Sequence, residues 1–371
     1  MNRSLFRFGS VVRLFLGLTA SPLLAQPAPE PAQTWPTPQE SDYVVRDFRF
    51  QSGETLPEVR LHYYTLGKPV KDKNGRTTNA VLILHGTGGS GDGFFRPIFA
   101  GVLFGPGQLL DAGKYFLILP DNVGHGKSSK PSDGLHARFP QYEYADMIAL
   151  EHELVDKGLG VNHLRLILGT SMGCMHSWLW GETYPEYMDA LMPLACLPVE
   201  LAGRNRVWRK MVIDGIRQDP EWKNGDYTTE PRAGLQIAAD FLIIAGSAPL
   251  HMQEELPTRD AADKFLENSL KRITSSLDAN DFLYAVNASR NYDPSPKLET
   301  VRAQVMSINS ADDFINPPEL GVAELEIKRV KNGRFLLLPA SEQTHGHGTH
   351  TWAAVWQQYL GELLERSGKG K

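Results

Sequence analysis

The sequence lacks the features that mark several classes of protein. Its 371 residues include only two cysteines, too few for a disulfide framework or for a zinc site built on cysteine. Lys and Arg number 38 against 43 Asp and Glu, so the net charge is −5 and no basic surface for nucleic acid is expected. With 42% hydrophobic and 22% charged residues, the composition excludes disordered, collagen-like and coiled-coil chains and fits a folded globular protein.

The apolar run at the N-terminus is too short for a comfortable membrane span. Arg3, Arg7 and Arg13 are scattered through it, and it closes with the small-residue exit Ser21–Ala25. A positive start, a short apolar core and such an exit are typical of a secretory signal peptide, so residues 1–25 are expected to be removed on export. An uncleaved amphipathic anchor is the alternative. We therefore predict a periplasmic or secreted protein without stable membrane insertion.

A proline-rich stretch, 26–42, follows the signal and is typical of an extended linker, so the folded chain is expected to begin near Tyr43. From there, short apolar runs alternate with segments of helical period, as in parallel strands buried on both faces. This alternation predicts an α/β fold, a mostly parallel eight-stranded sheet with helices on both faces. The eight candidate strands are Val44–Phe50, Val59–Thr65, Val81–Leu84, Tyr115–Leu119, Leu164–Leu168, Ala190–Ala195, Ala303–Ile308 and Phe335–Leu338.

The alternation stops between about Leu197 and Thr300, where the chain is polar and helical and contains Trp208 and Trp222. An insertion of this size between two parallel strands is expected to form a cap over the carboxyl edge of the sheet. The predicted organisation is therefore a core in two parts, 43–198 and 301–367, separated by a helical cap at 199–300.

A serine motif stands between the fifth candidate strand and a helix-forming run. The residues Gly169-Thr170-Ser171-Met172-Gly173 match G-x-S-x-G, the nucleophile elbow, in which a serine occupies a sharp strand-to-helix turn. Glycines two residues to either side let the neighbouring backbones pass closely. The turn lifts the hydroxyl above the sheet edge, and the N-terminus of the following helix directs N–H groups towards a developing oxyanion. Ser171 is the predicted nucleophile.

Three further features follow other strands in the order that such an elbow requires. A loop, His85-Gly86-Thr87-Gly88-Gly89, follows the third strand, so the backbone N–H groups of Thr87 and Met172 are the predicted oxyanion hole. Asp312 and Asp313 follow the seventh strand and are the candidate acids. His345, His347 and His350 follow the eighth strand and are the candidate bases. The order serine, acid, histidine is that of the α/β-hydrolase triad.

These features resemble the α/β-hydrolases, and specifically the branch that contains homoserine O-acetyltransferases and their hydrolase relatives. The resemblance covers most of residues 80–200 and resumes near 300–365. It includes the loops around Phe104–Gly107 and Asp121–Ser129, and the cap segment Asp219–Tyr227. The spacing of the family's acid before a proline selects Asp313, which leaves Asp312 as a helix cap near Pro317. The glycine that precedes the family's histidine selects His347.

Two departures from the branch bear on the activity. Its acetyltransferases follow the histidine with an aspartate for the homoserine amine, and here that position is Gly348. They also carry arginines for the substrate carboxylate in a segment that resembles Gly234–Asp240, which has none. Should transfer occur, the charges would have to come from elsewhere in the cap. Candidates for this role are the cap arginines Arg204, Arg206 and Arg209.

The sequence therefore predicts an exported serine hydrolase that cleaves a small carboxylic ester through an acyl-enzyme on Ser171. An O-acyltransferase of the homoserine O-acetyltransferase type is the alternative. The aromatic cap and the missing arginines favour a neutral ester. No cofactor is expected, and no metal, because the three histidines have no acidic partner at helical spacing. The expected partner is the small-molecule ester alone, with no nucleic acid, and the oligomeric state stays open, a homodimer being one candidate.

The two cysteines, Cys174 and Cys196, follow the serine turn and the next strand, so they are expected to lie near one another beneath the elbow. Buried free thiols are favoured over a disulfide.

Overall fold

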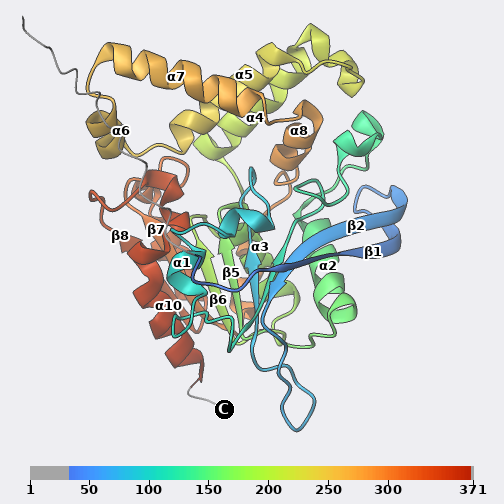
Figure 1. Ribbon diagram of the computed structural model, residues 1–371, viewed down its shortest axis with the longest axis vertical. Helices are drawn as coiled ribbons and strands as arrows, with labels where there is room; N and C mark the ends of the chain where they lie inside the picture. The colour runs from blue at the N-terminus through green and yellow to red at the C-terminus, as the bar shows by residue number, and fades with distance from the viewer. Residues whose placement is uncertain (1–32, 369–371) are drawn as a thin grey trace, which may run out of the picture. The chain divides into compact units, whose positions relative to one another are not determined.

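The computed structural model describes residues 33–368, so the predicted signal peptide, 1–25, lies outside the described residues. A single sheet of eight strands forms the centre of the molecule, in the order β1-β2-β4-β3-β5-β6-β7-β8 (Figure 1). The pairs β1–β2 and β2–β4 are antiparallel, and every other pair is parallel. The predicted α/β-hydrolase fold is confirmed. The strands are β1 Gln39–Arg49, β2 Thr55–Leu66, β3 Ala80–Leu84, β4 Phe116–Pro120, β5 Leu166–Thr170, β6 Ala190–Leu194, β7 Gln304–Ser310 and β8 Gly333–Leu338.

The first strand begins at Gln39, inside the stretch that the sequence assigns to the linker. The placement of the linker end at residue 42 is therefore wrong. The sequence pattern predicts this strand only from Val44, because polar residues at its start interrupt the hydrophobic pattern. Asp42 and Glu40 contact the two ring nitrogens of His62 on β2, at 2.7 and 3.2 Å.

Helices cover both faces of the sheet because the central strands bury alternate residues on each side. On one face, Leu82 and Ile167 pack with residues of α2 (Tyr144–Glu153) and α3 (Met172–Thr183). On the other face, Ile83 packs with α1 (Ala100–Leu103) and α10 (Ala353–Gly368). The short α9 (Val322–Glu326) stands between β7 and β8, and α2 runs on as a π-helical turn, Leu154–Gly158.

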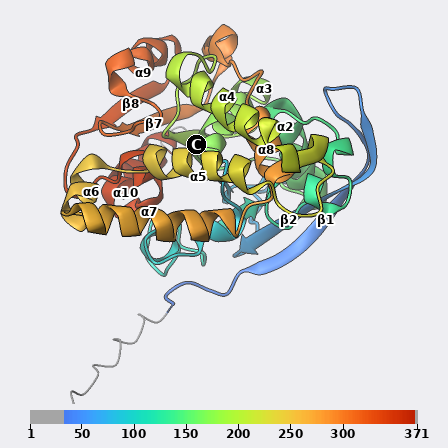
Figure 2. The ribbon, with the colours of Figure 1, turned by 90° about the horizontal axis from the view of Figure 1, so that it is seen from above.

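Five α-helices and two short 3-10 helices lie between β6 and β7, and the α-helices gather at one end of the sheet (Figure 1, yellow to orange). Seen from above, α5 and α7 run beside one another across this end (Figure 2). The helices are α4 Gly203–Gln218, α5 Arg232–Ala245, α6 Pro249–Glu255, α7 Arg259–Thr274 and α8 Ala279–Asn287. Across residues 33–368, no single helix has the length and apolar character of a membrane span; α5 and α6 reach it only as a pair, bent by 101°.

Two glycines allow α3 to approach the sheet closely at the serine turn. A Cβ atom on Gly173 would stand 2.1 Å from the carbonyl oxygen of Leu84 on β3, and one on Gly169 would stand 1.9 Å from the carbonyl oxygen of Gly173. Both obstacles are backbone atoms, which a rotamer change cannot move. The glycines of the motif are therefore required by packing between β3, β5 and the start of α3.

We predict that Gly173→Ala lowers the free energy of unfolding by about 3 kcal/mol, since overpacking against backbone lies at the upper end of the usual cost. Urea unfolding followed by circular dichroism measures it. Gly361→Ala on α10 is the matched control, because a Cβ there meets only Leu109, at 3.5 Å. Equal unfolding midpoints for the two variants would contradict the packing argument.

Candidate active site

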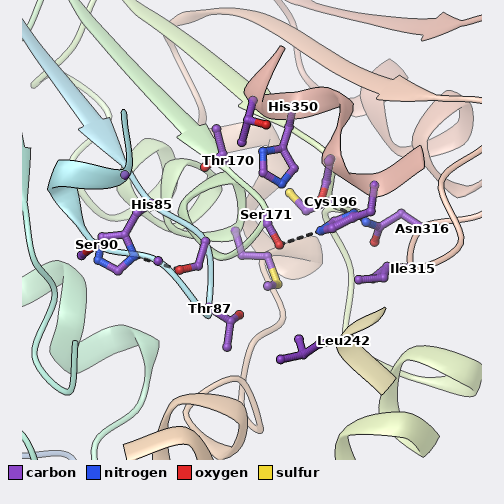
Figure 3. Close-up of a pocket in the computed structure, with 18 of the residues that line it drawn as sticks. His85, Thr87, Ser90, Thr170, Ser171, Cys196, Leu242, Ile315, Asn316 and His350 are labelled. Atoms are coloured by element: carbon purple, nitrogen blue, oxygen red, sulfur yellow. Dashed lines mark hydrogen bonds between the residues drawn. The ribbon is translucent and has the colours of Figure 1, made fainter. Parts of the chain in front are cut away.

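Ser171 stands in the turn between β5 and α3 with φ 53° and ψ −107°, a conformation that non-glycine residues rarely adopt. Such backbone strain persists only where the surrounding structure imposes it, and it is often found at functional sites. The Ser171 Oγ points into a cavity and lies 2.8 Å from Nε2 of His347 (dashed line at Ser171 in Figure 3).

The opposite ring nitrogen of the histidine meets the predicted acid. His347 Nδ1 lies 3.0 and 3.1 Å from the two carboxylate oxygens of Asp313, whose residue surface is 2% exposed. The backbone N–H groups of Ile315 and Asn316 donate to the same carboxylate at 2.8 and 3.1 Å. The structure therefore brings the serine, the histidine and the acid together in one chain of hydrogen bonds.

Burial raises the pKa of Asp313, but the neighbouring His347 and the hydrogen bonds from His347 and Asn316 outweigh it. The net effect is a pKa below the usual range of an aspartate. The carboxylate is thus ionised at neutral pH and can stabilise a positive charge on the imidazole.

The other candidate acid has a different position. Asp312 accepts hydrogen bonds from Thr344 Oγ1 at 2.8 Å and from the Gly346 N–H at 3.1 Å, and it contacts Ser310. The expectation that it caps a helix near Pro317 is wrong, because its carboxylate turns towards the segment that precedes His347. It joins the end of β7 to that segment.

The two other histidines do not contact the serine. His345 stacks between His251 of α6 and Trp352, at ring-centroid distances of 4.3 and 3.8 Å. His350 lines the cavity edge-on to His347, and burial lowers its pKa to about 3. It is therefore neutral at physiological pH.

The predicted oxyanion loop lies against the serine. A Cβ on Gly86 would stand 3.3 Å from Cβ of Ser171, and Thr87 lines the same cavity (Figure 3). Met172 is the first residue of α3, so its N–H belongs to the turn whose donors have no acceptor within the helix. Thr87 therefore lines the cavity that holds the hydroxyl, and Met172 directly follows Ser171; their role as the oxyanion hole stays a prediction.

Two buried histidines hold this loop in place. The Asn122 N–H donates to Nε2 of His85, which leaves Nδ1–H to donate to the Gly86 carbonyl. His125 Nε2 lies 3.0 Å from the Thr87 carbonyl oxygen. Burial lowers the pKa of His85 to about 4 and that of His125 to about 3, so both rings stay neutral and act as fixed hydrogen-bonding groups.

Cys174 and Cys196 form a disulfide, with their Cα atoms 5.9 Å apart. The two residues are close, as expected, but the prediction of free thiols is wrong. Cys174 lies in the first turn of α3, and Cys196 follows β6, the neighbour of β5, and lines the cavity. The bond ties the serine-bearing turn to the next strand. Sequence spacing predicts this proximity but carries no signal for the oxidation state.

The cavity above Ser171 has a volume of about 280 Å³. The core contributes the loops described above, and the cap contributes a mainly apolar wall. Within the described residues, its lining includes two arginines and no aspartate or glutamate. Sequence reasoning named Arg209 only as one of three arginines that a transferase would use, and did not select the other cap residues as lining, because their segments carry no motif. The cap residues of the lining are Asn205, Trp208, Arg209, Phe241, Leu242 and Phe282.

Comparison with known proteins identifies the family of this chain. The family described as alpha/beta hydrolase fold matches residues 79–364. The chain belongs to this family. Within it, the chain falls in the branch of homoserine O-acetyltransferases and related serine hydrolases. It is 30% identical, over 312 residues, to a homoserine O-acetyltransferase of Deferribacter desulfuricans, an alignment that covers 73% of this chain and 80% of the relative.

Solved structures of proteins with two different activities align with this chain with the same TM-score. The homoserine O-acetyltransferase of Bacillus anthracis aligns with a TM-score of 0.76 and 21% identity, over 89% of this chain and 98% of that one. An acetylester hydrolase of Corynebacterium glutamicum aligns with the same TM-score and 18% identity, over 88% and 96% of the two chains. Fold alone therefore does not distinguish transfer from hydrolysis.

Among residues 33–368, no group of three or more His, Cys, Asp or Glu side chains is arranged to hold a metal ion.

We predict that Ser171→Ala folds as the wild type does but turns over p-nitrophenyl acetate about 10⁴-fold more slowly, because no nucleophile remains. A fluorophosphonate probe should label the wild type at Ser171. The exposed Ser276→Ala is the control and should keep both properties. Wild-type turnover in Ser171→Ala would exclude this site.

Proposed function

We propose that this chain is an exported serine hydrolase that cleaves a small carboxylic ester through an acyl-enzyme on Ser171. The observation that carries the proposal is the hydrogen-bonded chain from Ser171 through His347 to Asp313, at 2.8 and 3.0 Å, beneath a cavity of substrate size. A nucleophile, a base and an orienting acid in that order are the requirements of acyl-enzyme chemistry.

In the proposed reaction, Ser171 Oγ attacks the ester carbonyl while His347 Nε2 accepts the serine proton. The oxyanion forms beside the N–H groups of Thr87 and Met172. The imidazolium, stabilised by Asp313, returns the proton to the departing alcohol, which leaves the acyl group on Ser171. Water then attacks the acyl-enzyme, with His347 as base, and releases the acid.

The composition of the cavity wall favours water over homoserine as the second nucleophile. An amino acid bound above the serine needs a partner for its ammonium group, because desolvation of an unpaired charge is costly. No lining residue from the described part of the chain carries a carboxylate. The cap helix α5 presents Phe241 and Leu242 to the cavity, whereas its Asp240 is exposed outside it. Gly348 supplies no charge after His347.

We predict that the purified protein hydrolyses short acyl esters, and that added homoserine changes neither the rate nor the product. The measurement is mass spectrometry of the products, with acetyl-CoA or p-nitrophenyl acetate as the acyl donor. Free acetate is the expected product, since an unpaired ammonium weakens acceptor binding by about 10-fold or more. Predominant O-acetylhomoserine would instead establish the acyltransferase alternative.

Export is the second part of the proposal, and the disulfide supports it. Disulfides persist in oxidising compartments and are rare in the cytosol of mesophiles. The Cys174–Cys196 bond is consistent with the signal-like features of residues 1–25.

We predict that the mature protein begins near Gln26 in a periplasmic or secreted fraction. N-terminal sequencing of the protein recovered from its native cells is the test, with a cytoplasmic enzyme as the fractionation control. An intact Met1 on soluble cytoplasmic protein would exclude export and strengthen the case for transfer.

A further inference from the structure

One charged side chain of the cap is buried in the same cavity as the nucleophile. Arg209 lies on α4, is 3% exposed, and lines the cavity together with Ser171 and His347. The other candidate arginines are placed differently. Arg204 donates to the Phe314 carbonyl outside this cavity, and Arg206 does not line it.

The guanidinium of Arg209 is held in position by uncharged groups. Nε donates to Asn205 Oδ1 at 3.0 Å, and Nη1 donates to Ser289 Oγ at 3.0 Å and to the Val286 carbonyl. Its plane packs over the ring of Trp208, with Cζ 4.4 Å from the centroid, and that ring stacks on Phe241. These contacts fix the orientation of the group before any ligand arrives.

None of these contacts neutralises the charge. Each of these hydrogen-bond acceptors is neutral, and the neighbouring Tyr144 hydroxyl, which also favours the cation, is uncharged because burial raises its pKa. Burial lowers the pKa of Arg209, because removal from water penalises the cation. A guanidinium nevertheless stays protonated in proteins. A buried charge without a counter-ion is costly, and a ligand that supplies one recovers that cost.

The second arginine of the cavity lining adds a further positive charge. Arg96, on the loop after β3, is exposed and also lines the cavity, whereas none of the described lining residues is acidic. A cavity that holds two cations and no carboxylate attracts anions and disfavours ammonium groups. An arginine fork also matches the geometry of a carboxylate.

We propose that the substrate is an ester that carries a carboxylate, and that Arg209 binds this carboxylate while the ester carbonyl lies at Ser171. The proposal rests on the proposed hydrolysis and replaces the expectation of a neutral ester. It differs from amino-acid recognition, because the cavity offers no partner to an ammonium group. The two chemical sources of the charge are an acyl group derived from a dicarboxylic acid and an alcohol that is a hydroxy acid.

The first experiment compares two matched pairs of substrates. Mono-p-nitrophenyl succinate and its methyl ester differ by a charge on the acyl side, and 2-acetoxypropanoate and its methyl ester differ by a charge on the alcohol side. In the wild type, the charged member of one pair should have the higher kcat/KM. Which pair shows the preference identifies the source of the charge.

The second experiment uses substitutions of Arg209 to test whether this side chain binds the carboxylate. Arg209→Gln should lower kcat/KM on the preferred anionic ester by about 10- to 100-fold, the range of a charge-assisted hydrogen bond, and leave its methyl ester within about threefold. Arg209→Lys should restore part of the loss. Arg217→Gln, which removes an exposed arginine of the same helix, is the matched control and should change neither substrate. Equal losses on the charged and neutral esters in folded Arg209→Gln would overturn the proposal.

A second measurement does not depend on turnover or on folding of the Arg209 variants. Succinate should bind the Ser171→Ala protein in calorimetry, and neutral succinamide should not. If the wild type cleaves no ester but Ser171→Ala binds succinate, the proposed hydrolysis fails and the anion site stands. If neutral and charged esters are cleaved equally and succinate does not bind, the anion site is excluded and the hydrolysis stands.

Discussion

The close contact between the start of α3 and the backbone of β3 and β5 is the constraint on which the rest of the site depends. Because Gly169 and Gly173 have no Cβ, the helix begins almost against the sheet, and Ser171 has to turn sharply between them. The positive φ of the serine is the cost of this arrangement, and tight packing on both sides maintains it. The Gly173 N–H, which donates to the His85 carbonyl at 2.9 Å, joins the turn to the oxyanion loop.

Parallel strands then bring the other groups to the same place. The serine follows β5, the acid follows β7 and the histidine follows β8, and the carboxyl ends of parallel strands share one edge of a sheet. Residues separated by more than a hundred positions thus meet without any long-range signal in the sequence. For this reason the fold and Ser171 could be predicted from the motif and the strand order, which also narrowed the acid to two residues and the base to three. The resemblance to the family then selected Asp313 and His347, which the structure joins by hydrogen bonds.

Other features could not be predicted, because they depend on contacts that no short pattern encodes. The role of Asp312 is set by its hydrogen bonds from Thr344 and Gly346, which follow β8, the strand paired with β7. The beginning of β1 depends on His62 of the neighbouring strand. On an amphipathic cap helix, an arginine usually faces solvent, so the burial of Arg209 depends on how α4 packs against α5 and α8. In each case tertiary packing decides what local sequence leaves open.

The cap enters the fold as one continuous insertion between β6 and β7, and this has a consequence for how the protein can diversify. The bond-breaking groups belong to the core, whereas Trp208, Arg209, Phe241, Leu242 and Phe282 all belong to the insertion. Substitutions within the cap can therefore alter which substrates bind, while the serine, the histidine and the acid stay unchanged. Proteins that share this fold can therefore change substrate specificity through substitutions in the cap, while the sheet stays the same.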